Sequence, residues 1–336
     1  MFGRRRSLTA VALCSVLGVT ACGSSSESSS ESDSPTVLAA FYPLEFVASR
    51  VTGDPASVEV LTSPGVDPHD LELSPRAVGE VKNADLVIYS SGLQQAVDAA
   101  VEEQAGDHSL DVNGAADLVP VEAEGADEGD AQESAHEGEG AHEHEGEDDE
   151  HSEEEGHAHE DEGGLDPHFW LDPTRMVAVT EAVEERIAKV DPDNAETYAA
   201  HAEKLTGELE ALQAEYDEGL ARCRHEDMVT THEAFGYIAR AHDLHLISIS
   251  GISPESEPGP ARLAEVARTV ERTQVPVIYT EVLLSRDIAD TVAEETGTQV
   301  RLLDPLEGLT EESPGSDYLS VMRSNLETLR AGQECS

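Results

Sequence analysis

Short apolar runs alternate with amphipathic segments along most of the chain after residue 35. In the first half, apolar runs at 36–40, 58–61 and 86–89 predict strands. The segments between and after these runs predict helices at 44–51, 74–83 and 94–104. Strands that alternate with helices favour a parallel sheet that is covered on both faces.

A second series of the same kind follows a long helical segment. Residues 174–188 predict one helix, and residues 195–220 predict another that is long enough to reach across two lobes. The later elements are expected as strands at 228–231, 244–249, 277–279 and 300–303 and as helices at 234–242, 261–272, 286–296 and 317–329. We therefore predict an α/β protein of two lobes, each a parallel sheet flanked by helices, joined by one long helix. The predicted boundaries are 36–192 for the N-terminal lobe, 193–222 for the linker helix and 223–336 for the C-terminal lobe.

Residues 1–22 resemble a bacterial lipoprotein signal peptide. Three arginines at 4–6 precede an apolar run at 8–19, which is too short to span a membrane as a helix. The run ends in Val-Thr-Ala followed by Cys22, which is similar to a lipobox. A lipidated Cys22 would hold the protein at the outer face of a membrane, and the serine-rich residues 23–35 would form a flexible tether. The alternative is an ordinary signal peptide that is cut near the same point.

One internal segment has a composition unlike the rest. Residues 122–164 carry 20 acidic residues, 6 histidines and no lysine or arginine. Such a segment cannot bury enough apolar surface to order itself, so we predict a disordered insert within the N-terminal lobe. Its candidate weak metal ligands are His136, His142, His144, His151, His157 and His159. The insert either gathers metal ions or is a solvated segment that binds them only incidentally.

The whole chain is strongly acidic. It has 71 acidic residues against 20 basic ones, which gives a formal net charge of −51. This charge argues against nucleic acid and anionic membrane surfaces as partners, and it favours the attraction of cations.

The cysteines agree with export from the cytoplasm. Cys14 lies inside the signal segment and Cys22 is the expected lipidation site, so Cys223 and Cys335 remain as an even pair. In an oxidising compartment we expect this pair to form a disulfide that ties the C-terminus to the second lobe. The alternative is two buried thiols.

Three histidines stand in loops at or after the ends of expected strands: His69, His168 and His232. In open α/β sheets, ligands bind outside the carboxyl ends of the strands, and Asp304 follows the last strand. Three imidazoles and one carboxylate suit a zinc site, although a single histidine is more often structural or solvated than a metal ligand. Glu281 is an alternative fourth ligand. Together with Asp67 and Glu233, it is also a candidate to hydrogen-bond a metal-binding histidine and orient its ring without binding the metal itself.

Four motifs are similar to those of the metal-binding receptors of ABC transporters known as cluster A-I, and in particular to the zinc branch. They are DPHFWLDP at 166–173, THEAFGY at 231–237, ISPESEP at 252–258 and LDPL at 303–306. The resemblance covers about residues 36–333. It implies two lobes with four-stranded parallel sheets joined by a rigid helix.

Carried over to this chain, the resemblance makes His69, His168 and His232 zinc ligands. Asp304 matches the fourth family position, which in zinc receptors either binds the metal directly or leaves room for water. Manganese receptors of the family place a glutamate where His232 stands, and a further imidazole favours zinc over metals that prefer oxygen. Zinc-branch members often carry an acidic, histidine-rich loop before the Asp-Pro-His motif, as this chain does.

These observations predict an extracytoplasmic, lipid-anchored, monomeric receptor that binds Zn²⁺ tightly and delivers it to the membrane permease of an ABC importer. No enzymatic activity is expected, and Zn²⁺ is the transported ligand. One alternative is a surface metal buffer or adhesin whose insert is the working part. A less favoured alternative is a zinc hydrolase, in which three histidines would leave a position open for water.

Overall fold

The computed structural model describes residues 34–121, 164–254 and 258–336. The strands are β1 (Thr36–Ala39), β2 (Ser57–Val60), β3 (Leu86–Tyr89), β4 (Ser109–Asp111), β5 (Asp227–Thr230), β6 (His245–Ser248), β7 (Val277–Thr280) and β8 (Gln299–Leu302). The α-helices are α1 (Tyr42–Thr52), α2 (Pro75–Asn83), α3 (Gln95–Gln104), α4 (Asn113–Ala116), α5 (Pro173–Val190), α6 (Ala195–Gly219), α7 (Gly236–Ala241), α8 (Pro260–Thr273), α9 (Asp287–Thr296) and α10 (Tyr318–Gly332). No helix among these described residues is both long and apolar enough to cross a membrane.

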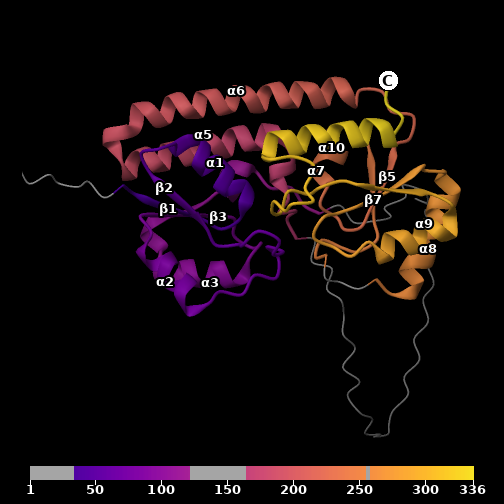
Figure 1. The fold of residues 1–336 in the computed structure, drawn as a ribbon, viewed down its shortest axis with the longest axis horizontal. Helices are drawn as coiled ribbons and strands as arrows, with labels where there is room; N and C mark the ends of the chain where they lie inside the picture. The colour runs from indigo at the N-terminus through magenta and orange to yellow at the C-terminus, as the bar shows by residue number, and fades with distance from the viewer. Residues whose placement is uncertain (1–33, 122–163, 255–257) are drawn as a thin grey trace, which may run out of the picture. The chain divides into compact units, whose positions relative to one another are not determined.

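The N-terminal half is built on a parallel sheet with the strand order β2-β1-β3-β4. β1 lies in the middle of the sheet, where Val37 pairs with Val58 of β2 and with Leu86 of β3. Its apolar side chains are buried because helices cover both faces, with α1 and α5 on one side and α2 and α3 on the other (Figure 1).

The C-terminal half repeats this arrangement with the strand order β6-β5-β7-β8, again all parallel. Every residue of β7 is buried. α8 and α9 pack together on the side of this sheet away from α10 (Figure 1). The prediction of two parallel-sheet lobes connected by a long helix is therefore confirmed, while the lobe boundaries stay a prediction.

The long helix α6 contacts both halves. Its buried face, which includes Tyr198, Leu205 and Tyr216, packs on α1 and α5 of the N-terminal half and on α10 of the C-terminal half (Figure 1). One continuous apolar core runs from β1 through Trp170 to α10, so the halves share buried surface rather than being joined only by a linker.

Local sequence signals explain where several helices begin. Ser74 caps α2 by accepting a hydrogen bond from the Ala77 N–H, and Asp172 caps α5 in the same way. Asp317 and Ser320 form a reciprocal capping box at the start of α10. These caps fix the ends of helices that lie next to the site described below.

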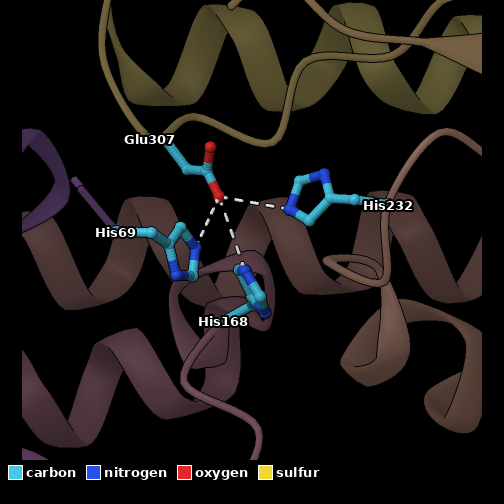
Figure 2. Close-up of side chains that lie close together, drawn as sticks. All are labelled: His69, His168, His232 and Glu307. Atoms are coloured by element: carbon cyan, nitrogen blue, oxygen red, sulfur yellow. Dashed lines mark hydrogen bonds and ion pairs between the residues drawn. The ribbon is translucent and has the colours of Figure 1, made fainter. Parts of the chain in front are cut away.

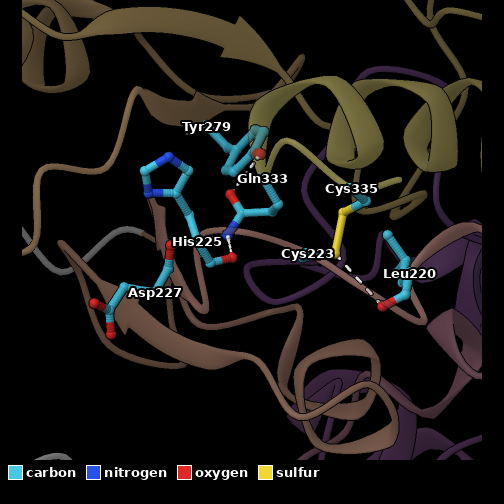
Figure 3. The surroundings of a disulfide bond; sticks show 7 residues. All are labelled: Leu220, Cys223, His225, Asp227, Tyr279, Gln333 and Cys335. Carbon is cyan, nitrogen blue, oxygen red and sulfur yellow. Dashed lines mark hydrogen bonds between the residues drawn. A yellow bond between two sulfur atoms is a disulfide. The ribbon is translucent and has the colours of Figure 1, made fainter.

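A disulfide ties the C-terminus to the start of the second sheet, as the cysteine count predicts. Cys223 and Cys335 are bonded across 112 positions of the sequence. The Gln333 side chain lies beside them and donates 2.9 Å hydrogen bonds to the carbonyls of His225 and Asp227 (Figure 3). The end of the chain is therefore held by both a covalent bond and hydrogen bonds.

Several predictions concern residues outside the described ranges. They are the signal peptide 1–22 with Cys22, most of the tether 23–35, and the six insert histidines His136, His142, His144, His151, His157 and His159. The residues on either side of 122–163 are described. The Val121 N–H donates to the Gly164 carbonyl at 2.9 Å, and Pro120 forms an antiparallel bridge with Leu165.

Candidate metal site

Three histidines and one glutamate from distant parts of the chain converge on one point. His69 follows β2, His168 precedes α5, His232 follows β5 and Glu307 follows β8. The side chains of His69, His168 and His232 all point toward the carboxylate of Glu307 (Figure 2). One donor atom from each of the four lies within 4.8 Å of the others, and His168, His232 and Glu307 are almost completely buried.

The distances from Glu307 to the three imidazoles match those expected between neighbouring donors in a tetrahedral zinc site. Glu307 Oε1 lies 3.2 Å from His69 Nε2, 3.4 Å from His168 Nε2 and 3.3 Å from His232 Nε2. Zinc bonds of 2.0–2.1 Å in a tetrahedron put neighbouring donors about 3.3–3.4 Å apart. Within the described residues, the buried Nε2 atoms of His168 and His232 have no hydrogen-bond partner. These atoms contact the Glu307 carboxylate as ion pairs but form no hydrogen bond, which is rare for buried polar atoms, so they mark a place for a cation.

Two carboxylates contact the Nδ1 atoms of the buried imidazoles, on the side of each ring away from Glu307, and thereby orient the rings. Asp166 Oδ1 lies 2.8 Å from His168 Nδ1 and also accepts the His168 backbone N–H. Glu281 Oε1 lies 2.7 Å from His232 Nδ1 and also accepts the Thr231 hydroxyl. A carboxylate at Nδ1 holds the proton there, which leaves Nε2 free to bind a metal.

The third histidine is held by its backbone. Asp67 Oδ1 accepts the N–H of His69 at 2.8 Å, which fixes the loop that carries the ring. His69 keeps 9% of its side chain exposed, whereas the side chains of the other three donors are at most 1% exposed. Solvent therefore reaches the site at His69.

The charges of the site stabilise protonated imidazoles opposite ionised carboxylates. Burial lowers the pKa of His232, but the negative charges of Glu281 and Glu307 outweigh burial and raise that pKa well above 6.5. Burial raises the pKa of Glu307, but the charge of His232 and the contacts of all three imidazoles bring it well below its usual value. A divalent cation can replace the protons in this balance.

Asp304, which the sequence analysis expected to bind zinc, lies outside the group of four donors. Its side chain is fully buried, and its Oδ1 accepts the N–H of Leu306 at 2.8 Å within its own loop. Burial raises the pKa of Asp304 to about 6. Leu306 has a positive φ of 59°, which turns the chain so that Glu307, and not Asp304, reaches the imidazoles. The structure thus groups Glu307, and not Asp304, with the three histidines, and the choice of carboxylate as the fourth zinc ligand stays a prediction.

Close packing around Asp166 explains two residues of the THEAFGY motif. A Cβ atom at Gly236 would lie 2.6 Å from Asp166 Oδ2, so the position requires glycine. The hydroxyl of Tyr237 donates to the Asp166 carbonyl at 2.7 Å. The start of α7 in the C-terminal half therefore supports the carboxylate that orients His168.

The remaining sequence candidates take different places. Glu281 lies behind His232 and is not a member of the four-donor group. Glu233 donates its backbone N–H to Gly251 and also lies outside the group. The sequence analysis did not single out Glu307 or Asp166. A glutamate three residues after Asp304 in the same loop was the signal available for Glu307.

Comparisons with known proteins agree with a zinc-binding role. A family model described as ZnuA, zinc-uptake complex component A, periplasmic, matches residues 37–332. The chain is 32% identical over 336 residues to the high-affinity zinc uptake system protein ZnuA of Bacillus subtilis (strain 168), covering 98% of each chain.

Two further matches come from Streptococcus pneumoniae. The chain is 32% identical over 330 residues to its zinc-binding lipoprotein AdcA (strain ATCC BAA-334 / TIGR4), covering 97% of this chain and 60% of that relative. The crystal structure of the Zn(II)-bound ZnuA-like domain of AdcA superimposes with a TM-score of 0.69 at 29% identity, covering 89% of this chain and 99% of that one. The family resemblance stated from the motifs is thus confirmed, and the chain belongs to the ZnuA family of zinc-uptake components.

Proposed function

We propose that this protein is an extracytoplasmic receptor that binds one Zn²⁺ with high affinity between His69, His168, His232 and Glu307. The observation that carries this proposal is the convergence of three imidazole nitrogens at 3.2–3.4 Å from a single buried carboxylate oxygen. Nitrogen-rich sites of this kind favour zinc over manganese or calcium, which prefer all-oxygen donors.

The bound ion is delivered to a membrane permease of an ABC importer. The B. subtilis relative, which matches over 98% of both chains, is named a component of a zinc uptake system, and the S. pneumoniae relative is named a lipoprotein. Lipidation at Cys22 would keep the receptor next to its permease. We propose that the receptor acts as a monomer, because both halves contribute donors to one site and the site needs no second copy.

Binding rather than catalysis is the chemistry that this arrangement favours. A catalytic zinc site keeps one position open for water, whereas here Glu307 stands at the fourth corner. The buffer interpretation, in which the insert is the working part, predicts weak sites only and makes no use of the buried four-donor group.

Calorimetric titration of the chain lacking residues 1–22 tests the proposal. We expect one tight site for Zn²⁺ and much weaker binding of Mn²⁺. His168→Ala should abolish the tight site, whereas His245→Ala, which changes an exposed histidine outside the group, should leave it intact. Several weak sites that persist in His168→Ala, with no tight site in the unaltered chain, would support the metal-buffer interpretation instead.

A further inference from the structure

Trp170, the only tryptophan of the chain, connects the two halves next to the metal site. Its side chain is fully buried, and its indole Nε1 donates to the Pro305 carbonyl at 2.7 Å. Its own carbonyl accepts the Tyr318 hydroxyl at 2.6 Å. Trp170 lies before α5 in the N-terminal half, whereas both partners belong to the C-terminal half, so these bonds cross from one half to the other.

These bonds join the segments that carry two of the four donors. Trp170 is two residues from His168, and their ring centroids are 5.2 Å apart. Pro305 is two residues from Glu307. The indole therefore links the chain that presents one imidazole to the chain that presents the carboxylate.

The Glu307 segment is rigid enough to transmit this contact. The side chain of Asn325 on α10 hydrogen-bonds both the N–H and the carbonyl of Asp304, at 3.0 and 2.6 Å. Asp304 in turn holds the left-handed turn at Leu306. Because the loop is fixed internally and to α10, a bond to Pro305 sets where Glu307 stands relative to the other half.

We propose that Trp170 is a positioning residue for zinc: its hydrogen bond to Pro305 sets the separation between the Glu307 carboxylate and the His168 imidazole and thereby slows release of the ion. The inference rests on the proposed function. Zinc sites tolerate deviations of about 0.2 Å in their bond lengths, so a small displacement of Glu307 weakens its bond to the metal. Apolar packing alone lacks the direction that this hydrogen bond supplies.

The test is the rate at which zinc leaves the full-length chain, measured by stopped-flow transfer to a chromogenic chelator. Trp170→Phe removes the indole N–H but keeps an aromatic ring, and we expect release to become about tenfold faster, the lower end of the effect of altering groups that support metal ligands. Tyr198→Phe is the matched control, because it removes the hydrogen bond of another buried aromatic side chain, to Asp191, that involves neither α10 nor a donor segment. An unchanged release rate in Trp170→Phe would overturn the inference.

A double-variant comparison separates positioning from general loosening of the structure. If Trp170 acts through Glu307, then Trp170→Phe should change the release rate little in a Glu307→Gln background. An equal acceleration in both backgrounds would mean that Trp170 acts elsewhere, and the inference would fail.

If Trp170→Phe does not fold, a measurement on the unaltered chain tests the positioning role of Trp170. The single indole N–H gives one NMR signal, whose hydrogen exchange should be slower with zinc than without it, because the ion and the bond to Pro305 hold the same segment. Equal exchange rates would contradict the inference. A chain that binds no zinc tightly would refute the proposed function itself, which is a different outcome.

Discussion

Glu281 stands directly behind His232, with its Oε1 atom 2.7 Å from Nδ1 of the imidazole and both side chains buried. The carboxylate thereby fixes the ring so that Nε2 faces Glu307, 3.3 Å away. Replacement of Glu281 by Gln keeps the shape and removes the charge. We expect zinc affinity near neutral pH to fall about tenfold, as is typical when a carboxylate behind a metal-bound histidine is altered.

The pH dependence of this effect identifies its cause. The charge of Glu281 is the first of the influences that raise the pKa of His232, so Glu281→Gln also weakens proton competition for that ring. The affinity difference from the unaltered chain should shrink as pH falls. Calorimetry at several pH values measures it, with Glu185→Gln on the exposed face of α5 as the control for simple loss of charge. A difference that stays constant with pH would argue against this account.

Glu307 and Asp304 offer a direct comparison of two carboxylates in one loop. Glu307→Gln should lower zinc affinity more than about 100-fold, beyond the range expected for a supporting group. Asp304→Asn should leave the affinity nearly unchanged, since its remaining oxygen can still accept the Leu306 N–H. Competition against a chelator of known affinity measures both variants. A larger loss in Asp304→Asn than in Glu307→Gln would restore Asp304 as the fourth donor.

Zinc affinity should fall as pH falls, beginning above pH 6.5. The raised pKa of His232 means that this ring still holds a proton in the metal-free protein at pH values where a free histidine is neutral. Zinc must displace that proton, so binding near pH 7 should release about one proton or more per ion. Titrations in buffers of different ionisation enthalpy count the protons, and zinc binding without proton release would contradict the prediction.

The raised pKa of His232 affects the stability of the metal-free protein in the opposite direction: its contribution is largest at low pH, where zinc affinity is lowest. A raised pKa in the folded state means that His232 stabilises the fold fully below pH 6.5, and this contribution is lost as pH rises through the folded-state value. The pairing also lowers the pKa of Glu307, so its contribution is present above pH 4.5 and is lost as pH falls through its folded-state value. Thermal unfolding of the metal-free chain across this range checks both signs.

We expect the fold to persist when residues 122–163 are removed, because the residues on either side of this segment pair with each other. Val121 and Gly164 share a hydrogen bond, and Pro120 and Leu165 form an antiparallel bridge. Replacement of 122–163 by Asn-Gly, a pair that suits a two-residue hairpin turn, should therefore keep the tight zinc site and remove only the weak ones. Calorimetry counts the sites. Loss of the tight site in the shortened chain would show that the insert contributes to it.

The disulfide should stabilise the fold without affecting zinc. It closes a loop of 112 positions, for which the chain-entropy model gives about 4–5 kcal/mol. Cys223→Ser combined with Cys335→Ser should lower the free energy of unfolding by about this amount at most. Zinc affinity should stay unchanged, because neither cysteine belongs to the four-donor group. Denaturant titration and a thiol count on the unfolded chain check both statements, and two free thiols in the unaltered protein would refute the bond.

Much of the fold follows from the sequence because buried parallel strands have a strong local signature. β3 lies at 86–89 as predicted, and β7 differs from its prediction by one residue, since both are short runs of large apolar side chains. β4 was missed because its three residues, Ser-Leu-Asp, have no such signature and depend on pairing with β3. α7 is shorter than predicted because Ala234 and Phe235 belong to the turn before it.

The sequence analysis named three of the four residues that the structure brings together. The three histidines stand in distinctive motifs, but the choice between Asp304 and Glu307 depends on the backbone of Leu306. A leucine with φ of 59° is uncommon, and no pattern of residue types predicts it. The orienting role of Asp166 depends on a three-dimensional contact with α7, which the motif alone does not reveal.

The apolar core that both halves share limits how far the shape of the protein can change when zinc binds. Parting the halves would expose apolar surface around Trp170 and Tyr318, at a cost of about 25 cal/mol for each Å². A wide separation of the two halves is therefore disfavoured, whether or not zinc is bound. If the proposed delivery to a permease holds, the zinc-bound protein would be recognised at the loops around the ion, where binding changes the charge more than the shape.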